Sequence, residues 1–199
     1  MHVLHRKQKE GLGRAYLAGF AWALKREYLA VIEMDADLSH DPLYLPPMIE
    51  AALEADVVIG SRYLNGISVI NWPLRRILLS WGANEYVRFW TRLPVHDCTS
   101  GFRLYDRKVL EGINLETVRS NGYSFQVEMT FRANLAGYEI AEVPIIFAER
   151  RSGQSKMSKR VILESVLMPI QLRLRGGLLK RQLRKKAQSL RKSQTAGSR

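Results

Sequence analysis

The chain has 199 residues, of which 46% are hydrophobic, so it is long enough to form one domain with a sizeable core. Its single cysteine excludes an internal disulfide and agrees with a reducing compartment. No apolar run approaches the roughly 18 residues needed to cross a bilayer, and the charged N-terminus lacks the apolar segment of a signal peptide. We therefore expect a cytoplasmic protein.

The formal net charge of +12 is unevenly distributed along the chain. Residues 150–199 contain 15 Lys and Arg against a single acid, Glu164, and so carry +14. Residues 1–149 contain 16 bases and 18 acids, which leaves −2. This asymmetry predicts an anionic partner for the C-terminal region, either a membrane surface or nucleic acid.

Helix and strand patterns alternate along the chain, and their order predicts an α/β fold with parallel strands. The expected helices cover 14–26, 46–54, 73–92 and 123–136, the last ended by Gly137. The expected strands cover 29–34, 56–60 and 141–148, and a turn from residue 99 leads into a further strand near 105. Because proline cannot donate a ladder hydrogen bond, Pro144 predicts an edge or bulge position for the last strand.

Two carboxylates, Asp35 and Asp37, directly follow the apolar run 29–32. In an extended backbone, side chains two residues apart point the same way. Two neighbouring anions repel unless a cation lies between them, and hard oxygen ligands suit Mg²⁺ or Mn²⁺. The pair therefore predicts a metal site, although a solvated turn at a strand end would show the same short motif.

Further motifs follow one another in order from about residue 4 to residue 158. They are Arg6-x-x-Lys9-x-Gly11-Leu12-Gly13, Met34-Asp35-Ala36-Asp37-Leu38-Ser39-His40-Asp41-Pro42, Gly60-Ser61-Arg62-Tyr63, Trp72-x-x-x-Arg76-x-x-x-Ser80-x-x-Ala83-Asn84, Asp97-x-Thr99-Ser100-Gly101-Phe102-Arg103, Tyr123-x-Phe125-Gln126-x-Glu128, Glu142-Val143-Pro144-Ile145 and Arg150-x-x-Gly153-x-Ser155-Lys156. No single motif is diagnostic, but the ordered set is specific. On these residues the chain resembles the polyprenol-phosphate mannose synthases, or dolichyl-phosphate mannosyltransferases, of glycosyltransferase family 2.

The resemblance implies a GT-A-like, Rossmann-related mixed sheet flanked by helices. It implies an inverting, metal-dependent transfer of mannose from GDP-mannose to a polyprenyl phosphate. Residues 1–158 would form the C-terminal part of a family 2 domain, and 159–199 a basic helical tail. Members of this family begin with Ile-Pro-Thr-Tyr-Asn-Glu-like and Asp-Asp-x-Ser-x-Asp-Gly-Thr-like segments that hold the nucleoside. This sequence lacks both, so we expect an N-terminally truncated chain that binds the donor weakly.

The resemblance also implies roles for individual residues. Asp35 and Asp37 would hold Mg²⁺ or Mn²⁺ against the leaving diphosphate. The expected phosphate contacts are Arg62, Arg76, Arg103, Arg150, Ser155 and Lys156. The expected catalytic group comprises Asp97, Gln126 and Glu128, which would position metal, sugar or acceptor, or else support the loops. A polyprenyl phosphate is already ionised, so no strong general base is required. The four histidines show no ligand spacing, which indicates surface or structural roles.

In the tail, Leu179, Leu183, Ala187 and Leu190 recur at helical spacing among Lys and Arg. This pattern predicts a basic amphipathic helix that lies on an anionic membrane surface, at the cytoplasmic face. A lipid-linked acceptor favours the membrane over specific binding of nucleic acid, and a membrane-anchor subunit is an additional partner to consider.

Two alternative interpretations stay open. One is a polyprenyl-phosphate glucosyltransferase, which would use the same kind of acceptor. The other is an inactive fragment whose basic tail binds membrane or nucleic acid. The intact phosphate-site residues argue against the fragment, whereas the lack of the nucleoside-binding segments argues for it.

Overall fold

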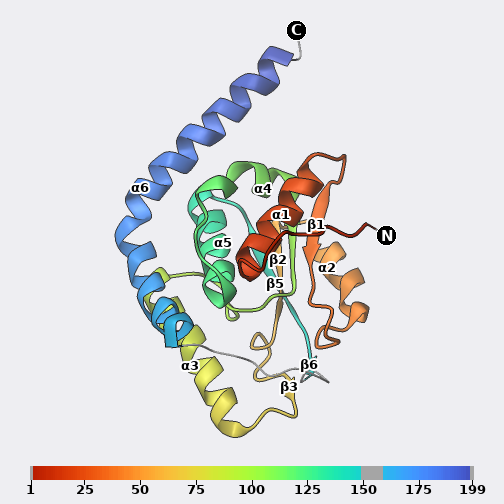
Figure 1. Cartoon of the computed structure of the whole chain (residues 1–199), viewed down its shortest axis with the longest axis vertical. Coiled ribbons are helices and arrows are strands. Elements are labelled where there is room, and N and C mark those ends of the chain that lie inside the picture. The colour runs from red at the N-terminus through yellow and green to blue at the C-terminus, as the bar shows by residue number, and fades with distance from the viewer. Residues whose placement is uncertain (1, 149–158, 198–199) are drawn as a thin grey trace.

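The computed structural model describes residues 2–148 and 159–197. Its centre is a four-stranded sheet in the order β1-β4-β2-β5 (Figure 1). The strands are β1 (Ala30–Glu33), β4 (Arg103–Asp106), β2 (Val57–Ser61) and β5 (Ile140–Pro144). Helices cover the sheet on both faces, so the predicted mixed α/β architecture is confirmed.

The strand directions differ in part from the sequence prediction. Strand β4 is antiparallel to both β1 and β2, whereas β2 is parallel to β5. Thus β1, β2 and β5 run in one direction, as predicted, and β4 returns between them in the other. The helix–strand order along the chain could not show this, because it does not say which strands become neighbours.

The helices agree with their predicted spans to within a few residues. They are α1 (Leu12–Leu24), α2 (Leu45–Ala51), α3 (Leu74–Thr91), α4 (Arg107–Gly112), α5 (Gly122–Ala136) and α6 (Lys159–Gly197). Gly137 ends α5 in the left-handed region at φ 86°, as predicted. Helix α4 and the two-residue strand β3 (Val69–Ile70) were not predicted, since both are too short to show a period.

The span 141–148 forms two strands instead of one. Strand β5 is an edge strand of the main sheet and ends at Pro144, which confirms the edge position that the proline predicted. The chain then passes to β6 (Phe147–Ala148), which pairs in parallel with β3 in a separate two-stranded sheet. This crossing carries Phe147 toward the segment that follows β2.

The alternation of side chains along the strands divides the core into two clusters. Val57, Ile59 and Tyr105 lie in the larger cluster, under α1, α4, α5 and α6. Val58 and Leu104 lie in the smaller one, under α2. Gly13 lets α1 approach the start of α5, because a Cβ there would lie 2.5 Å from the Ser120 carbonyl oxygen.

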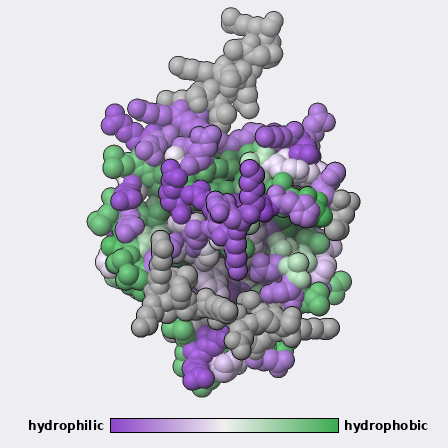
Figure 2. Space-filling model, in the orientation of Figure 1, coloured by the Kyte–Doolittle hydropathy of each residue, from purple (hydrophilic) through white to green (hydrophobic). Residues whose placement is uncertain are grey.

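Helix α6 contributes directly to the larger cluster, and this corrects part of the tail prediction. Met168, Leu172, Leu179 and Leu183 are buried against the body of the protein. The leucines that were expected to enter a membrane, Leu179 and Leu183, therefore stabilise the fold. Figure 2 shows hydrophobic residues gathered along the left edge, where Figure 1 places α6. Among the described residues, no helix combines the length and apolar character needed to span a bilayer.

The burial of Leu183 gives a stability prediction. Leu183 is 2% exposed, so Leu183→Ala should lower the free energy of unfolding by about 2–5 kcal/mol through lost burial and a cavity. Leu178, on the same helix, is 69% exposed, and Leu178→Ala should change it by less than about 0.5 kcal/mol. Urea denaturation of both variants measures the difference, and equal stabilities would contradict this packing of α6.

Candidate active site

Three chain segments meet at one end of the sheet because of the strand directions. Strands β1 and β2 end there, and the antiparallel β4 begins there. Consequently the segment after β1, with Asp35, lies near Arg62 after β2 and near the loop 97–102 before β4. The sequence motifs that lie far apart along the chain are thus brought together by topology.

Arg62 and Asp97 form a buried ion pair at the centre of this region. Arg62 Nε donates to Asp97 Oδ2 at 2.7 Å, Nη2 donates to Oδ1 at 2.7 Å, and the Arg62 backbone N–H donates to Oδ2 at 3.0 Å. Burial disfavours the charge on Asp97, but the bonds from Arg62 outweigh it and hold the pKa of Asp97 below its ordinary value. The pair also raises the pKa of Arg62 against the opposing effect of burial.

The loop that carries Asp97 is held from two further elements. Glu142 of β5 accepts from the Asp97 backbone N–H at 2.9 Å with Oε1, and from His96 with Oε2. Asn84 of α3 accepts from the Cys98 N–H at 2.8 Å. Asp97 therefore has a structural environment: its carboxylate is bonded to Arg62 and Thr99 and is fully buried. Contact with a substrate, predicted for Asp97 as one option, is not supported by this geometry.

Arg103 also has a structural environment, which differs from the predicted phosphate contact. Its side chain is 0% exposed. Nε donates to the Ser100 carbonyl at 2.7 Å, Nη2 to the Cys98 carbonyl at 2.9 Å, and Nη1 to the Thr130 hydroxyl. A guanidinium group enclosed in this way fixes the loop between Cys98 and Ser100 and has no surface to offer a phosphate.

The carboxylates of Asp35 and Asp37 are both half-buried. Strand β1 ends at Glu33, and residues 36–40 form a bend in which Leu38 has φ 66°, so the extended backbone predicted for the pair does not continue through Asp37. Asp35 Oδ1 accepts from the Tyr16 hydroxyl at 3.1 Å, and Asp37 Oδ1 accepts from Ser39. The turn, instead of the strand, positions the two carboxylates.

His40 is the residue around which this turn is organised, and sequence reasoning gave it no site role. Its ring is 2% exposed, and Nδ1 accepts from the Asp35 N–H at 3.1 Å, which places the proton of the neutral ring on Nε2. Burial lowers the pKa of His40, while Asp35 and Asp37 oppose that shift and Arg62 adds to it. His40 thus lies within electrostatic reach of both the carboxylate pair and the ion pair.

Arg62 and Arg76 share one aromatic platform, the indole of Trp72. The Arg76 guanidinium lies 3.9 Å from the ring centroid and that of Arg62 lies 5.7 Å from it. Phe147 of β6 completes the group, 5.5 Å from the Arg62 guanidinium and 5.6 Å from the Trp72 ring. Asp97 compensates the charge of Arg62, so Trp72 and Phe147 hold both guanidinium groups in place without requiring a further anion.

Gln126 lies behind the carboxylate pair. Its Nε2 donates to Glu33 Oε2 at 2.9 Å, and both side chains are buried. Burial raises the pKa of Glu33 to about 8, although Arg103 and the bond from Gln126 act against the rise. Gln126 therefore supports the end of β1, two residues before Asp35, and its side chain does not face solvent.

Glu128 is enclosed by bonds to structural partners. Oε1 accepts from Arg132 Nε at 2.9 Å and Nη2 at 2.6 Å, and Oε2 accepts from the Ser120 N–H and hydroxyl. This buried carboxylate joins two turns of α5 to the loop before the helix, which corrects the predicted catalytic placement. Arg150, Ser155 and Lys156 lie outside the described residues.

Sequence reasoning missed Trp72, Phe147 and Glu33 as well as His40. Trp72 lies in one of the sequence motifs without a predicted role, and Glu33 lies in the expected strand 29–34. A signal was present for Glu33, since a carboxylate inside a buried strand needs a partner. No local signal could have brought Phe147 to Arg62, because that contact depends on the switch from β5 to β6.

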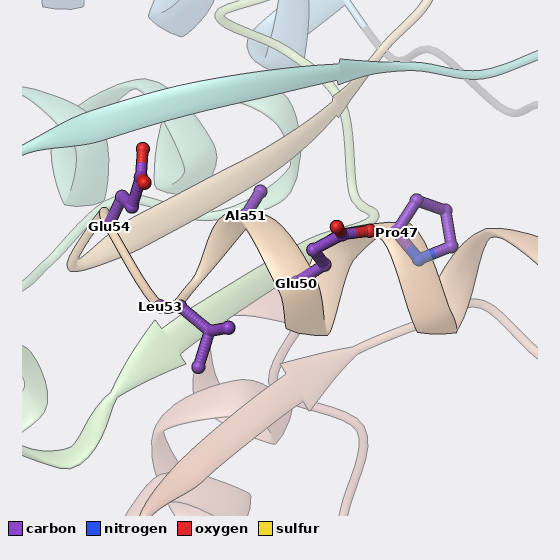
Figure 3. Close-up of a pocket in the computed structure, with 5 residues that line it drawn as sticks. All are labelled: Pro47, Glu50, Ala51, Leu53 and Glu54. Atoms are coloured by element: carbon purple, nitrogen blue, oxygen red, sulfur yellow. The ribbon is translucent and has the colours of Figure 1, made fainter.

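A separate surface pocket lies on α2. It is lined by Pro47, Glu50, Ala51, Leu53 and Glu54, all from α2 and the turn that follows it (Figure 3). None of these residues belongs to the predicted site. The cluster of Asp35, Asp37, Arg62 and Arg76 is therefore the candidate active site.

Comparison with known proteins identifies the class to which this fold and site belong. Residues 1–113 match glycosyl transferase family 2, and the chain belongs to this family. The structure of glucosyl-3-phosphoglycerate synthase from Mycobacterium tuberculosis, in complex with Mn²⁺, uridine-diphosphate-glucose and phosphoglyceric acid, shares the fold with a TM-score of 0.54 at 18% identity. That match covers 85% of this chain and 57% of the other, and it confirms the GT-A-like fold.

Two relatives narrow the resemblance within the family. The chain is 49% identical to polyprenol monophosphomannose synthase from Mycolicibacterium smegmatis over 179 residues, which are 89% of this chain and 68% of the relative. It is 48% identical to undecaprenyl-phosphate mannosyltransferase from Micrococcus luteus over 167 residues, which are 84% of this chain and 69% of the relative. The resemblance to polyprenol-phosphate mannose synthases is thereby confirmed.

The ion pair gives the second prediction. Asp97→Asn would leave Arg62 buried without its counter-charge, so the free energy of unfolding should fall by about 3–5 kcal/mol. Glu85→Gln is the matched control, because its pair with Arg88 is largely exposed and should contribute less than about 1 kcal/mol. Thermal and urea denaturation compare the two. If Asp97→Asn were as stable as the control, the contribution of this ion pair to the stability of the fold would be refuted.

Proposed function

We propose that this chain transfers mannose from GDP-mannose to a polyprenyl phosphate, with inversion and with a divalent metal. Identities of 48–49% to two enzymes named for this chemistry support the assignment of sugar and acceptor. The observation that carries it in the structure is that the carboxylates Asp35 and Asp37 lie at the same end of the sheet as Arg76, which stacks on Trp72 beside the Arg62–Asp97 ion pair. Carboxylates for a metal and guanidinium groups for phosphates are what a reaction with an anionic donor and an anionic acceptor requires.

The carboxylate pair fits a metal that is shared with the donor. The described residues contain no group of three or more His, Cys, Asp or Glu that could hold an ion unaided. Mg²⁺ is usually bound by one or two carboxylates together with substrate phosphates, and Asp35 and Asp37 supply that number. A metal held there would neutralise the charge that develops on the leaving diphosphate.

The environments of Asp97 and Glu128 also favour an acceptor that is already ionised. A sugar hydroxyl would need a general base, and a base must be within hydrogen-bonding reach of the acceptor. Asp97 is enclosed by Arg62, and Glu128 is bonded to Arg132 and Ser120, so neither of these predicted acids faces a substrate. A phosphate acceptor avoids this requirement because its oxygen is a nucleophile without further deprotonation.

The metal assignment leads to a third prediction. Asp35→Asn and Asp37→Asn should each lower metal-dependent transfer by roughly 100-fold or more, because the charge on the leaving group would lose its compensation. Asp41→Asn is the control, since its exposed carboxylate caps a turn by accepting from the Leu43 N–H at 2.9 Å. Circular dichroism should show unchanged melting for all three.

Transfer is measured as incorporation of labelled mannose into a short polyprenyl phosphate, with Mg²⁺, with Mn²⁺ and with EDTA. The assay uses this chain and a chimera that adds the part of the Mycolicibacterium smegmatis relative outside the aligned 179 residues. Full activity of either Asp variant in EDTA would refute the metal pair. Equal transfer from GDP-mannose and GDP-glucose would refute the assignment of mannose.

The aromatic platform leads to a fourth prediction. Arg76→Ala should raise the KM for a phosphate-bearing substrate by roughly tenfold, which is the effect of one lost charge-assisted contact. Arg75→Ala, the neighbouring exposed arginine, is the control and should leave KM unchanged. Steady-state kinetics with donor and acceptor varied in turn shows which phosphate is affected. Identical kinetics of the two variants would remove Arg76 from the site.

A further inference from the structure

Helix α6 carries apolar side chains on two opposite faces. The inner face is buried in the core, whereas Leu174 and Leu178 are 79% and 69% exposed. Leu172 and Leu174 are two residues apart, which is about 200° around a helix axis, so one core cannot cover both. The sequence pattern suggested a single apolar face, and the structure separates it into a face that packs and a face that does not.

Helix α3 likewise has an inner side that packs against the protein and an outer side that is exposed. Its inner side carries Ser80, which accepts from the Tyr63 hydroxyl at 2.7 Å, and Asn84, which holds the Cys98 N–H of the site loop. On its opposite side Phe89 is 76% exposed, and Leu78 is also exposed. One side of α3 therefore builds the candidate active site, and the other presents large apolar side chains to solvent.

The two exposed faces adjoin. Helices α3 and α6 lie next to each other (Figure 1), and the Tyr86 hydroxyl donates to the Val166 carbonyl at 2.8 Å. We define the outer face as the exposed apolar residues of both helices: Leu74, Leu78, Leu79, Trp81, Phe89, Leu163, Val166, Leu167, Leu174 and Leu178. On each helix the set spans 16 residues, a rise of about 22 Å along the axis. Apolar patches of this extent on a soluble surface mark interaction sites.

The charges beside the outer face indicate the chemistry of its partner. Arg173 and Arg175 flank Leu174 and are exposed, as are Lys180 and Arg181 beyond Leu178. The sequence from residue 165 to 199 contains no acid. A partner that covers this face should be apolar where the leucines lie and anionic beside them. A bilayer with anionic headgroups has both properties, and exposed tryptophan and phenylalanine suit its interface.

We propose that the outer face of α3 and α6 docks on an anionic bilayer, with its leucines between the lipid headgroups. This inference rests on the proposed function in one respect, since a lipid-borne acceptor gives docking its purpose. It assigns membrane contact to a different face of α6 from the one that the leucine spacing of the tail predicted. Because α3 also carries Arg76, whose guanidinium group stacks on Trp72 of the candidate site, docking places that site next to the membrane surface.

The test is co-sedimentation with vesicles of phosphatidylcholine, with and without phosphatidylglycerol, in the absence of donor. The double variant Leu174→Ser/Leu178→Ser should bind roughly tenfold or more weakly than the unchanged chain, because two apolar side chains are no longer buried on docking. Leu43→Ser/Leu53→Ser is the matched control, since both leucines are exposed elsewhere, at 79% and 83%. Unchanged melting temperatures of both variants verify folding.

Binding that needs phosphatidylglycerol, and that only the α6 variant loses, would support the proposal. Equal binding by both variants would overturn it. A second result would also overturn it. If light scattering showed a dimer, and if Leu174→Ser/Leu178→Ser dissociated that dimer without affecting vesicle binding, the outer face would join two copies of the chain. The proposal would also be overturned if RNA displaced the chain completely from the vesicles and the leucine changes had no effect, because the basic charges alone would then account for binding. Vesicle binding is scored without donor, so loss of sugar transfer alone refutes the proposed function and leaves docking standing.

Discussion

The buried ion pair between Arg62 and Asp97 is the interaction on which the site depends. It joins the end of β2 to the loop before β4, and that loop is tied in turn to α3 through Asn84 and to β5 through Glu142. Enclosing two charges is costly unless every hydrogen-bonding position is used, and here the carboxylate accepts from Arg62 and Thr99. The same geometry that satisfies the pair also fixes Arg62 against Trp72 and Phe147.

This arrangement explains why residues of one motif divide into two kinds. Asp97 and Arg103 belong to a single stretch with Thr99 and Gly101, yet both are enclosed and support the loop. A loop beside an active site needs groups that hold its backbone in place as well as groups that can touch a ligand. Sequence reasoning identified the stretch but could not assign its members, since burial of a side chain is a property of the fold.

Several helices could be predicted from the sequence because their boundary residues are recognisable, as with Pro73 before α3 and Gly137 after α5. The direction of β4 could not be predicted, because pairing between strands distant in sequence leaves no local pattern. The tail shows a further limit. Leu179 and Leu183 satisfy the spacing of a membrane-surface helix and of a core helix equally well, and only the position of α5 and α4 beside them decides between these.

Helix α3 connects the proposed docking face to the chemistry. Its inner side holds the site loop through Asn84, and its outer side exposes Leu78 and Phe89. A helix with its side chains is about 10–12 Å across, so a bilayer in contact with the outer side would lie one helix diameter from the arginines on the inner side. A phosphate at the headgroup level of that bilayer would need to rise by little more than this distance to reach Arg76. A single amphipathic helix, apolar outward and polar inward, is thus sufficient to bring a lipid-borne anion and a water-soluble donor to the same cluster of charges.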